Sequence, residues 1–296
     1  MAKQRRSLSG KVVAITGGAR GIGRAMAAAL VRKGCRVALG DLDMALAEQA
    51  AAELGGGTIA VQLDVTDRDS FSAFLDEAER QLGPLDVVIN NAGIMPVTPF
   101  AEESDDSIRR QLDINVYGVV AGTQLAIERM RRRGGGHIVN VASSAGKAGV
   151  PGIATYSGTK HFVVGFTEAV RAEYGAEGID FSYVMPITVN TQLIEGLKDH
   201  PGVKRVEPED VANEVVNALE TGKVDVYVPR QLRASVMIGG LLPRRVREAM
   251  ARVMGVTKVL TEVSPEARRA YEERAAHSEP GVAGEPSTEP SEQKAA

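Results

Sequence analysis

The chain has 296 residues, of which 44% are hydrophobic and 25% are charged, with a net charge of -3 and a pI near 5.9. This length suits one large α/β domain or two small ones. The charge balance gives no electrostatic reason to expect nucleic acid as a partner. The single cysteine, Cys35, excludes an intrachain disulfide and fits a reducing compartment, so we expect a cytoplasmic protein.

The N-terminal arm, residues 1–9, is basic but precedes no apolar stretch of the kind found in a secretory signal. No segment approaches the roughly 18 apolar residues that a membrane-spanning helix needs. Between residues 10 and 230, short β-branched runs alternate with helical patterns. Seven of these runs are expected to be strands: 11–16, 35–40, 58–63, 85–90, 137–142, 179–184 and 224–228.

These runs are nearly continuous in apolar residues, which is typical of parallel strands buried on both faces. Helical patterns such as residues 21–33 and 69–82 separate them. Strand–helix alternation of this kind predicts an α/β fold, a doubly wound parallel sheet of about seven strands with helices on both faces. We therefore predict one Rossmann-type domain over residues 10–230.

A helical extension is predicted over residues 231–276. One helix is expected over 244–255, after Pro243, and a second begins at Ser264 as N-cap with Pro265 in the first helical position. The extension either packs on the domain or on a second copy and shapes the pocket, or rests on an anionic membrane surface. The tail, residues 277–296, is rich in Pro, Glu, Ser and Gly and is expected to be disordered.

The stretch "TGGARGIGR", residues 16–24, lies between the first strand and the first helix. Its glycines, Gly17, Gly21 and Gly23, allow backbone N–H groups to approach a pyrophosphate, next to the positive end of the helix dipole. No Lys-Ser/Thr pair follows, which excludes a nucleoside triphosphate loop. Asp41 ends the second strand, where a carboxylate accepts hydrogen bonds from a ribose 2′-OH and repels a 2′-phosphate. NAD is therefore expected rather than NADP, although Arg20 could pair with a 2′-phosphate.

Tyr156 and Lys160 lie four residues apart on a predicted amphipathic helix, so their side chains share one face. Alone, this pair is better explained by a solvated helix surface, because short motifs often occur by chance. The pair gains weight from the segments around it: "NNAG" at 90–93, "LDVT" at 63–66, "NVYG" at 115–118 and "IVNVASSAG" at 138–146. In this order, these motifs and the glycine turn resemble the short-chain dehydrogenase/reductase family, over roughly residues 8–230.

The resemblance implies catalytic roles for Asn115, Ser143, Tyr156 and Lys160. Tyr156 would exchange a proton with the substrate oxygen, Ser143 would orient that oxygen, Lys160 would also hold the nicotinamide ribose, and Asn115 would position a relay water. Lys160 and a positive nicotinamide ring should favour phenolate, and a Tyr156 pKa of about 7–8 requires roughly 3–4 kcal/mol of stabilisation. The resemblance implies these cofactor-binding residues: Gly17, Arg20, Gly21, Ile22, Gly23, Asp41, Asp64, Val65, Asn91, Ala92, Gly93, Tyr156, Lys160, Pro186, Val189 and Thr191.

One position departs from the family pattern, because Ile187 follows Pro186 where the family usually has glycine. This adds bulk near the expected nicotinamide position. No His, Cys or carboxylate spacing resembles a metal site. The four histidines have ordinary structural explanations.

The loops expected to face the substrate, residues 94–104, 145–155 and 187–205, are largely apolar and favour a lipophilic secondary alcohol or ketone. Lys147 could instead recognise an acidic group. The family implies a homodimer or homotetramer through helices near 105–133 and 154–175. Three alternatives remain: an NADPH-dependent 3-oxoacyl-thioester reductase, which Asp41 opposes, a nucleotide-sugar epimerase or dehydratase, which the glycine spacing opposes, and a non-catalytic NAD sensor.

Overall fold

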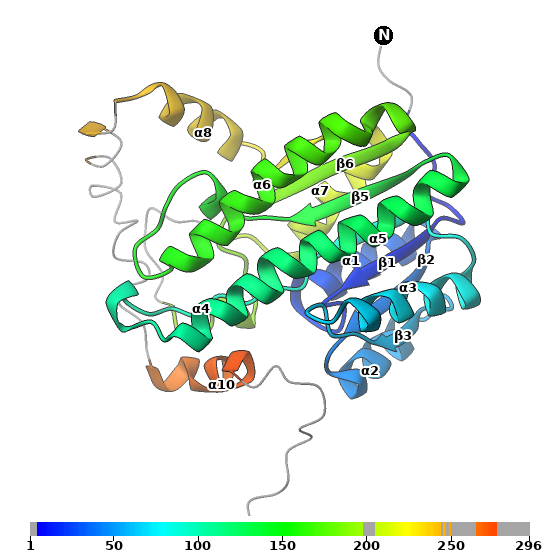
Figure 1. Cartoon of the computed structure of the whole chain (residues 1–296), viewed down its shortest axis with the longest axis horizontal. Coiled ribbons are helices and arrows are strands. Elements are labelled where there is room, and N and C mark those ends of the chain that lie inside the picture. Colours follow the sequence, from blue (N-terminus) through cyan, green and yellow to red (C-terminus); the bar gives the residue numbers. More distant parts are fainter. Residues whose placement is uncertain (1–4, 198–204, 244, 247–248, 250–264, 277–296) are drawn as a thin grey trace, which may run out of the picture.

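The computed structural model describes residues 5–197, 205–243, 245–246, 249 and 265–276. Seven parallel strands form one sheet in the order β3-β2-β1-β4-β5-β6-β7 (Figure 1). The strands are β1 (Val12–Thr16), β2 (Arg36–Asp41), β3 (Ile59–Gln62), β4 (Val87–Asn90), β5 (Gly136–Val141), β6 (Ile179–Pro186) and β7 (Asp225–Val228). The prediction of a doubly wound, seven-stranded parallel sheet is confirmed.

The helices cover both faces of this sheet. They are α1 (Gly21–Arg32), α2 (Met44–Leu54), α3 (Arg68–Leu82), α4 (Asp105–Leu112), α5 (Gly118–Arg133), α6 (Ala154–Tyr174), α7 (Pro208–Thr221), α8 (Leu232–Leu241) and α10 (Pro265–Ala276). Short 3₁₀ turns lie at Phe100–Glu102, Ser144–Gly146, Gly175–Glu177 and Gln192–Ile194, and a π-helical turn at Asp113–Tyr117 joins α4 to α5.

Alternate residues of each strand serve the two faces, as the pleat requires. On one face, Val13 and Ile15 of β1 belong to the core that α1 and α7 complete. On the other face, Val12 and Ala14 belong to the core that includes α3 and α5. Both cores are closed to water, since these four side chains are fully buried. Burial on both faces explains why the strands read as continuous apolar runs in the sequence.

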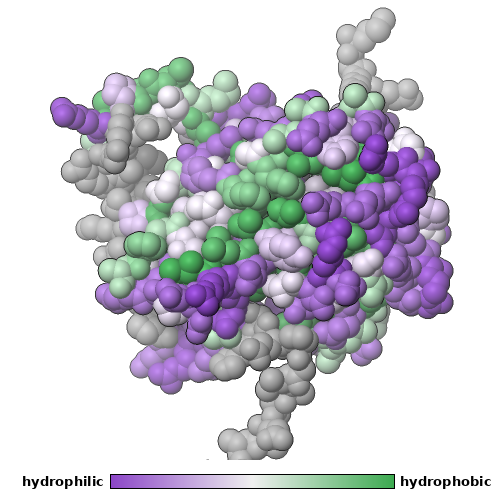
Figure 2. Space-filling view, in the orientation of Figure 1, coloured by the Kyte–Doolittle hydropathy of each residue, from purple (hydrophilic) through white to green (hydrophobic). Residues whose placement is uncertain are grey.

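The C-terminal extension contains a helix that the sequence analysis did not predict, α8, which ends at Leu241, before Pro243. Within the predicted helix over 244–255, the described residues 245, 246 and 249 are helical, and the others lie outside the described residues. No side chain of α8 is buried, and Met237, Ile238 and Leu241 are 59%, 59% and 86% exposed. Leu232 and Val236 of α8 pack against the core beside β7, while the far end of the helix presents an apolar surface (Figures 1 and 2). Helix α10 begins at Pro265, as predicted; the predicted cap Ser264 and the tail 277–296 lie outside the described residues.

Within the described part of the chain, every helix is too short or too polar to cross a membrane. The strand order changes direction between β1 and β4, because the chain extends to β2 and β3 on one side and to β5, β6 and β7 on the other. At such a switch point the loops after neighbouring strands diverge and leave a crevice at the carboxyl edge of the sheet. The predicted site residues lie at or after the ends of β1, β2, β3, β4, β5 and β6 and are therefore expected at this edge.

Candidate active site

The glycine turn after β1 brings the chain back on itself. Gly17 and Gly21 have φ of 64° and 53°, which side chains other than glycine rarely adopt. A Cβ added to Gly23 would lie 2.0 Å from the carbonyl oxygen of Gly17, so α1 can start this close to the turn only with glycine there. The first turn of α1 has no side-chain cap and no acidic residue. Its N–H groups therefore form an anion-binding end at the switch point.

Two side chains fasten this turn to the end of β4. Asn91 donates its side-chain amide to the carbonyl oxygens of Thr16 and Gly17, at 2.9 and 3.1 Å. In return, the Thr16 hydroxyl accepts the backbone N–H groups of Asn91 and Ala92, at 2.9 and 3.0 Å. The predicted residues Asn91 and Ala92 thus lie against the glycine turn. Their contacts with Thr16 fix its shape.

Asp41 lies at the end of β2, beside the same turn. Its carboxylate accepts the backbone N–H of Ala19 at 3.0 Å and that of Asp43 at 3.2 Å. Arg20 does not face this carboxylate; it donates to Asp43 at 2.6 Å, in an ion pair whose two side chains are both more than a third exposed. The carboxylates of Asp41 and Asp43 therefore lie together at the end of β2, with the Arg20 guanidinium paired to Asp43.

The other predicted cofactor residues border the crevice from three sides. The Asp64 carboxylate accepts both the backbone N–H and the hydroxyl of Thr66, at 2.8 and 2.7 Å, and Val65 packs against Gly118. Across the crevice, Thr191 lies next to Gly21, within 3.4 Å of the position of an added Cβ. The remaining members are partly or fully buried: Ile22, Pro186 and Val189. Ile187, the departure from the family pattern, packs against the core below.

Asn115 lies in the π-helical turn between α4 and α5 and is fully buried. Its side chain exchanges two hydrogen bonds of 2.9 Å with the backbone N–H and carbonyl of Ile94. It also donates to the hydroxyl of Thr159 at 3.3 Å. A Cβ on Gly93 would lie 3.0 Å from Asn115 Oδ1 and 3.6 Å from Lys160 Nζ. Asn115 and Lys160 therefore flank the same glycine, and Asn115 holds the loop after β4 in place.

Tyr156, Lys160 and Ser143 meet at the end of β5. Lys160 Nζ donates to the carbonyl of Val141 at 2.9 Å and lies 5.5 Å from the centroid of the Tyr156 ring. Ser143 forms a side-chain hydrogen bond with Tyr156, and its hydroxyl also accepts the backbone N–H of Ala145 at 3.2 Å. The exposed fractions of Tyr156 and Lys160 are only 7% and 4%. The side chains of Tyr156, Lys160 and Ser143 thus lie together at the end of β5. Gly93 lies between Asn115 and Lys160.

The pKa values of Tyr156 and Lys160 are set mainly by their burial. Burial raises the pKa of the Tyr156 phenol well above its usual range, the hydrogen bond with Ser143 lowers it and the nearby Tyr271 phenol raises it further. Burial also lowers the pKa of Lys160 to about 8. Desolvation of this phenol therefore outweighs the stabilisation that Ser143 provides in the chain by itself. The expected lowering of the Tyr156 pKa includes the charge of a nicotinamide ring and stays a prediction.

Among known protein families, the model of the short chain dehydrogenases matches residues 11–202 of this chain. The chain is a short-chain dehydrogenase. Over 224 residues it is 34% identical to glycine betaine reductase ATRR of Emericella nidulans, a match that covers 72% of this chain and 18% of that much longer protein. It is 29% identical over 263 residues to 17-beta-hydroxysteroid dehydrogenase 13 of Rattus norvegicus, with 86% of both chains covered.

Among solved structures, this dehydrogenase resembles 3-ketoacyl-(acyl-carrier-protein) reductase from Brucella melitensis complexed with NADH. The TM-score is 0.70 and the identity 28%, over 75% of this chain and 98% of that chain. Membership of the family makes the protein an oxidoreductase.

The sequence analysis missed several residues of the dehydrogenase site. Thr16 and Thr159 are small polar residues inside apolar elements, and a buried hydroxyl of that kind could have been suspected of bonding to a neighbour. Tyr271 and Arg268 of α10 also reach the crevice. Their one signal was that Tyr271 is the only aromatic residue in an otherwise charged helix.

Proposed function

We propose that this dehydrogenase interconverts secondary alcohols and ketones with NAD, and that Tyr156 exchanges the proton. The observation that carries the proposal is the meeting of Tyr156, Ser143 and Lys160 at one buried point beside Gly93. A phenol, a hydroxyl and an ammonium at one point can hold a substrate oxygen and move its proton. A nicotinamide dinucleotide at the crevice would supply the hydride acceptor or donor.

The crevice fits such a cofactor. The uncapped first turn of α1, with Gly17 and Gly23 closing on each other, leaves N–H groups free for a pyrophosphate. Asp41 would accept the adenosine ribose hydroxyls. Arg20 supports NAD rather than NADP, because its guanidinium is already engaged by Asp43 at 2.6 Å. The NADH complex of the Brucella melitensis relative agrees with this assignment.

In the proposed reaction, Ser143 holds the substrate oxygen and Tyr156 accepts its proton during oxidation. Tyr156 must be a phenolate before this transfer, a state that the positive charge of Lys160 favours, and accepting the proton returns it to the phenol. Lys160 would also hold the cofactor ribose. Asn115 keeps the loop after β4, and with it Gly93, at the correct distance from Lys160. Exclusion of water follows from the burial of Tyr156 and Lys160, which strengthens these electrostatic interactions.

A lipophilic substrate is proposed from the lining around Tyr156. Met95, Ile153, Ile194 and Leu197 form one buried apolar cluster with the Tyr156 ring. Lys147, the cation that could have recognised an acidic group, pairs with Glu168 at 3.6 Å and lies over the Tyr183 ring instead. The name of the Rattus norvegicus relative, a hydroxysteroid dehydrogenase, points to the same substrate class.

Substitution of Tyr156 by Phe tests the reaction. We expect turnover of secondary alcohols to fall by at least ~10²-fold, because the positioned proton acceptor is lost. The dissociation constant for NADH should change little, since Phe keeps the buried ring. Near-normal turnover of the Tyr156→Phe enzyme would refute the assignment of Tyr156. The Ser144→Ala enzyme is the control, because Ser144 neighbours Ser143 without its contact to Tyr156.

A second candidate, reduction of 3-oxoacyl thioesters with NADPH, draws support from the Brucella melitensis relative. Acetoacetyl thioesters and NADPH therefore belong in the assay panel. Binding of NADH without turnover of any alcohol, ketone or thioester would favour a non-catalytic sensor.

We also propose that the dehydrogenase forms a homodimer or homotetramer through α4, α5 and α6. Apolar side chains are exposed on these helices and between them: Leu112, Tyr117 and Phe162, at 46%, 41% and 39%. Figure 2 shows hydrophobic surface across this face of the molecule, where Figure 1 places α5 and α6. Light scattering after size exclusion measures the state, and substitution of Phe162 by Glu should shift it toward the monomer.

A further inference from the structure

Helix α10 is fastened to two loops of the candidate site through Arg268. The guanidinium of Arg268 is almost completely buried, with 2% of the residue exposed. It donates to the carbonyl oxygens of Leu193 and Glu195, at 3.0 and 3.3 Å, and to that of Met95. Its Nε donates to Glu272 at 2.5 Å. Because Met95 follows β4 while Leu193 and Glu195 follow β6, one side chain joins both loops to α10.

Tyr271 lies one turn further along α10 and points to the same side. It is 8% exposed, and the Arg268 guanidinium lies 4.6 Å from the centroid of its ring. Its hydroxyl accepts the backbone N–H of Met95 at 2.7 Å. Among the described residues, no acceptor for the proton of this hydroxyl is recorded. Burial raises the pKa of Tyr271 to about 12, so the phenol keeps its proton at neutral pH.

Met95 links the two phenols, because its backbone N–H bonds to the Tyr271 hydroxyl while its side chain packs in one cluster with the Tyr156 ring. The segment between them alternates like a strand: Met95 and Val97 face the apolar cluster around Tyr156, while Ile94, Pro96 and Thr98 face the other way. A substrate oxygen that reaches Tyr156 must therefore displace or contact the residues of this cluster and of α10. Tyr271 presents both a ring and a free donor at that position.

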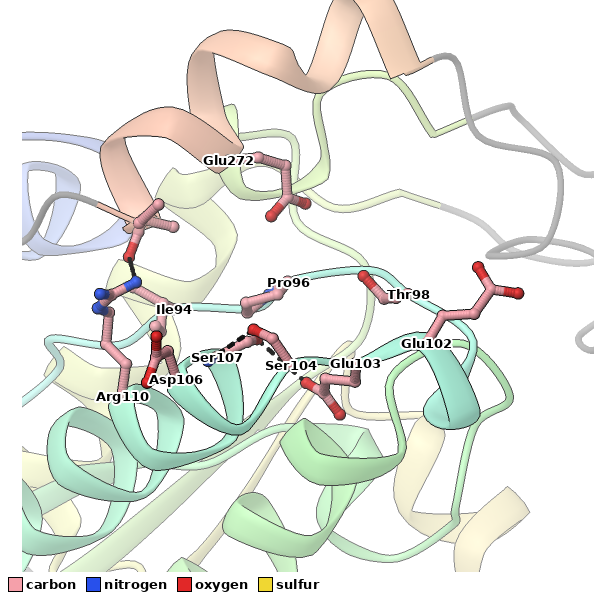
Figure 3. Close-up of a pocket in the computed structure, with 12 residues that line it drawn as sticks. Ile94, Pro96, Thr98, Glu102, Glu103, Ser104, Asp106, Ser107, Arg110 and Glu272 are labelled. Atoms are coloured by element: carbon pink, nitrogen blue, oxygen red, sulfur yellow. Dashed lines mark hydrogen bonds between the residues drawn. The ribbon is translucent and has the colours of Figure 1, made fainter.

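Behind this segment lies a cavity of about 420 Å³ between α10 and α4 (Figure 3). Ile94, Pro96 and Thr98 line one side of it and Glu272 projects into it from α10. At the far end, Arg110 of α4 donates to the carbonyl of Ala275 at 3.3 Å. Helix α10 is thus held at both ends.

We propose that α10 is the outer wall of the substrate cleft, that Tyr271 contacts the body of a lipophilic alcohol or ketone and limits its size, and that Arg268 is a positioning residue that holds this wall against both loops. This inference rests on the proposed function of Tyr156. The substrate class is an apolar secondary alcohol that carries, away from the carbinol, an oxygen able to accept the Tyr271 proton. A hydroxy-ketone on a fused-ring skeleton has this chemistry.

The test compares kcat/KM for a fused-ring hydroxy-ketone with kcat/KM for 2-butanol, both with NAD. Substitution of Tyr271 by Ala should change the ratio of the two values by at least about tenfold, because it alters a contact that only the larger substrate makes. The Tyr271→Phe enzyme keeps the ring and loses only the hydroxyl. Its ratio of kcat/KM values should therefore return part of the way from the Tyr271→Ala value to the wild-type value. Arg268→Gln should raise KM for the large substrate while kcat changes by less than about threefold, since Tyr156 keeps its neighbours.

The matched control is Arg269→Gln, because Arg269 is the adjacent, exposed arginine of the same helix. An unchanged ratio in a Tyr271→Ala enzyme that melts cooperatively and binds NADH would overturn the proposal. If the Tyr271→Ala enzyme does not fold, hydrogen exchange of the wild-type chain tests the proposal instead. NADH together with the corresponding fused-ring diol, a pair that cannot react because neither hydroxyl accepts a hydride, should slow exchange of residues 265–276 beyond the effect of NADH alone.

Protection of residues 154–166 by the alcohol without protection of 265–276 would also overturn the role of α10. The two proposals fail separately. A wild-type enzyme that binds NADH and the alcohol but oxidises neither substrate would refute the proposed reaction, while the exchange data still report whether α10 covers the bound alcohol.

Discussion

Substitution of Lys160 by Met should stabilise the fold while it removes the activity. Lys160 is buried, and desolvation lowers its pKa from 10.5 to about 8. At 1.36 kcal/mol per pKa unit, keeping this ammonium charged in the folded state costs about 3 kcal/mol below pH 8. Met keeps the length of the side chain and carries no charge. It also loses the hydrogen bond to the Val141 carbonyl, worth about 1.5 kcal/mol. The net gain at pH 7 is about 1.5–2 kcal/mol.

The pH dependence carries the sharper part of the prediction. Between pH 8 and 10.5 the unfolded chain binds a proton at Lys160 that the folded chain has lost, so the free energy of unfolding of the wild type rises with pH in this window. The Lys160→Met chain lacks this rise. The difference in free energy of unfolding between Lys160→Met and the wild type should therefore fall to about zero near pH 9.5. At that pH the remaining cost of burying the Lys160 charge equals the free energy of the lost hydrogen bond.

Urea unfolding of both chains at pH 7, 8.5 and 9.5 measures this difference, and other titrating groups cancel between the two. Lys147→Met is the control, because Lys147 is on the same side of the sheet but partly exposed and paired with Glu168. A Lys160→Met chain that is no more stable than the wild type at pH 7, or a difference that does not change with pH, would refute the reasoning. It would mean that the lysine charge is solvated in the folded state.

Three further changes test the crevice and the core. Asp41→Asn removes a charge but keeps a hydrogen-bond acceptor. The preference for NADH over NADPH, measured as a ratio of dissociation constants, should therefore decrease at least about tenfold. An unchanged ratio would mean that another group recognises the ribose. Gly23→Ala places a methyl group 2.0 Å from the Gly17 carbonyl and should abolish NADH binding and destabilise the fold by about 2 kcal/mol or more, whereas Gly165→Ala, a helical glycine with nothing within 4 Å, should be neutral or stabilising. Burial lowers the pKa of His137 to about 4, so the wild type should lose up to about 3 kcal/mol as pH falls from 6.5 to 4; His137→Gln should lose measurably less in urea unfolding, and an equal loss would contradict the assignment.

The sheet could be predicted because its physics is local. A parallel strand covered on both faces must be apolar at nearly every position, and that pattern is visible without knowledge of its neighbours. All seven strands lie within two residues of their predicted limits. The glycine turn was equally accessible, since positive φ at Gly17 and Gly21 and the close approach at Gly23 can be met only by glycine.

The electrostatics of the site could not be predicted in the same way. The position of Tyr156 next to Lys160 follows from helical spacing, but the pKa of a phenol depends on how much water surrounds it in the folded chain. Burial to 7% exposure is a product of residues from three loops and of α10, which are far apart in the sequence. Neighbouring charges therefore suggested a lowered pKa for Tyr156, while burial in the chain by itself raises it.

Helix α10 shows where sequence patterns stop being informative. Arg268 and Arg269 are adjacent and chemically identical, yet one is buried against three carbonyl oxygens and the other is exposed. No periodicity within a short, charged helix distinguishes them, because the difference arises from the two loops on which the helix lies. A buried guanidinium persists only where its donors are satisfied, and backbone carbonyls of irregular loops supply the acceptors here. The loops that the sequence marked only as apolar thus bind Arg268 through backbone carbonyls, while Met95, Leu193 and Ile194 keep their side chains in the apolar cluster with Tyr156.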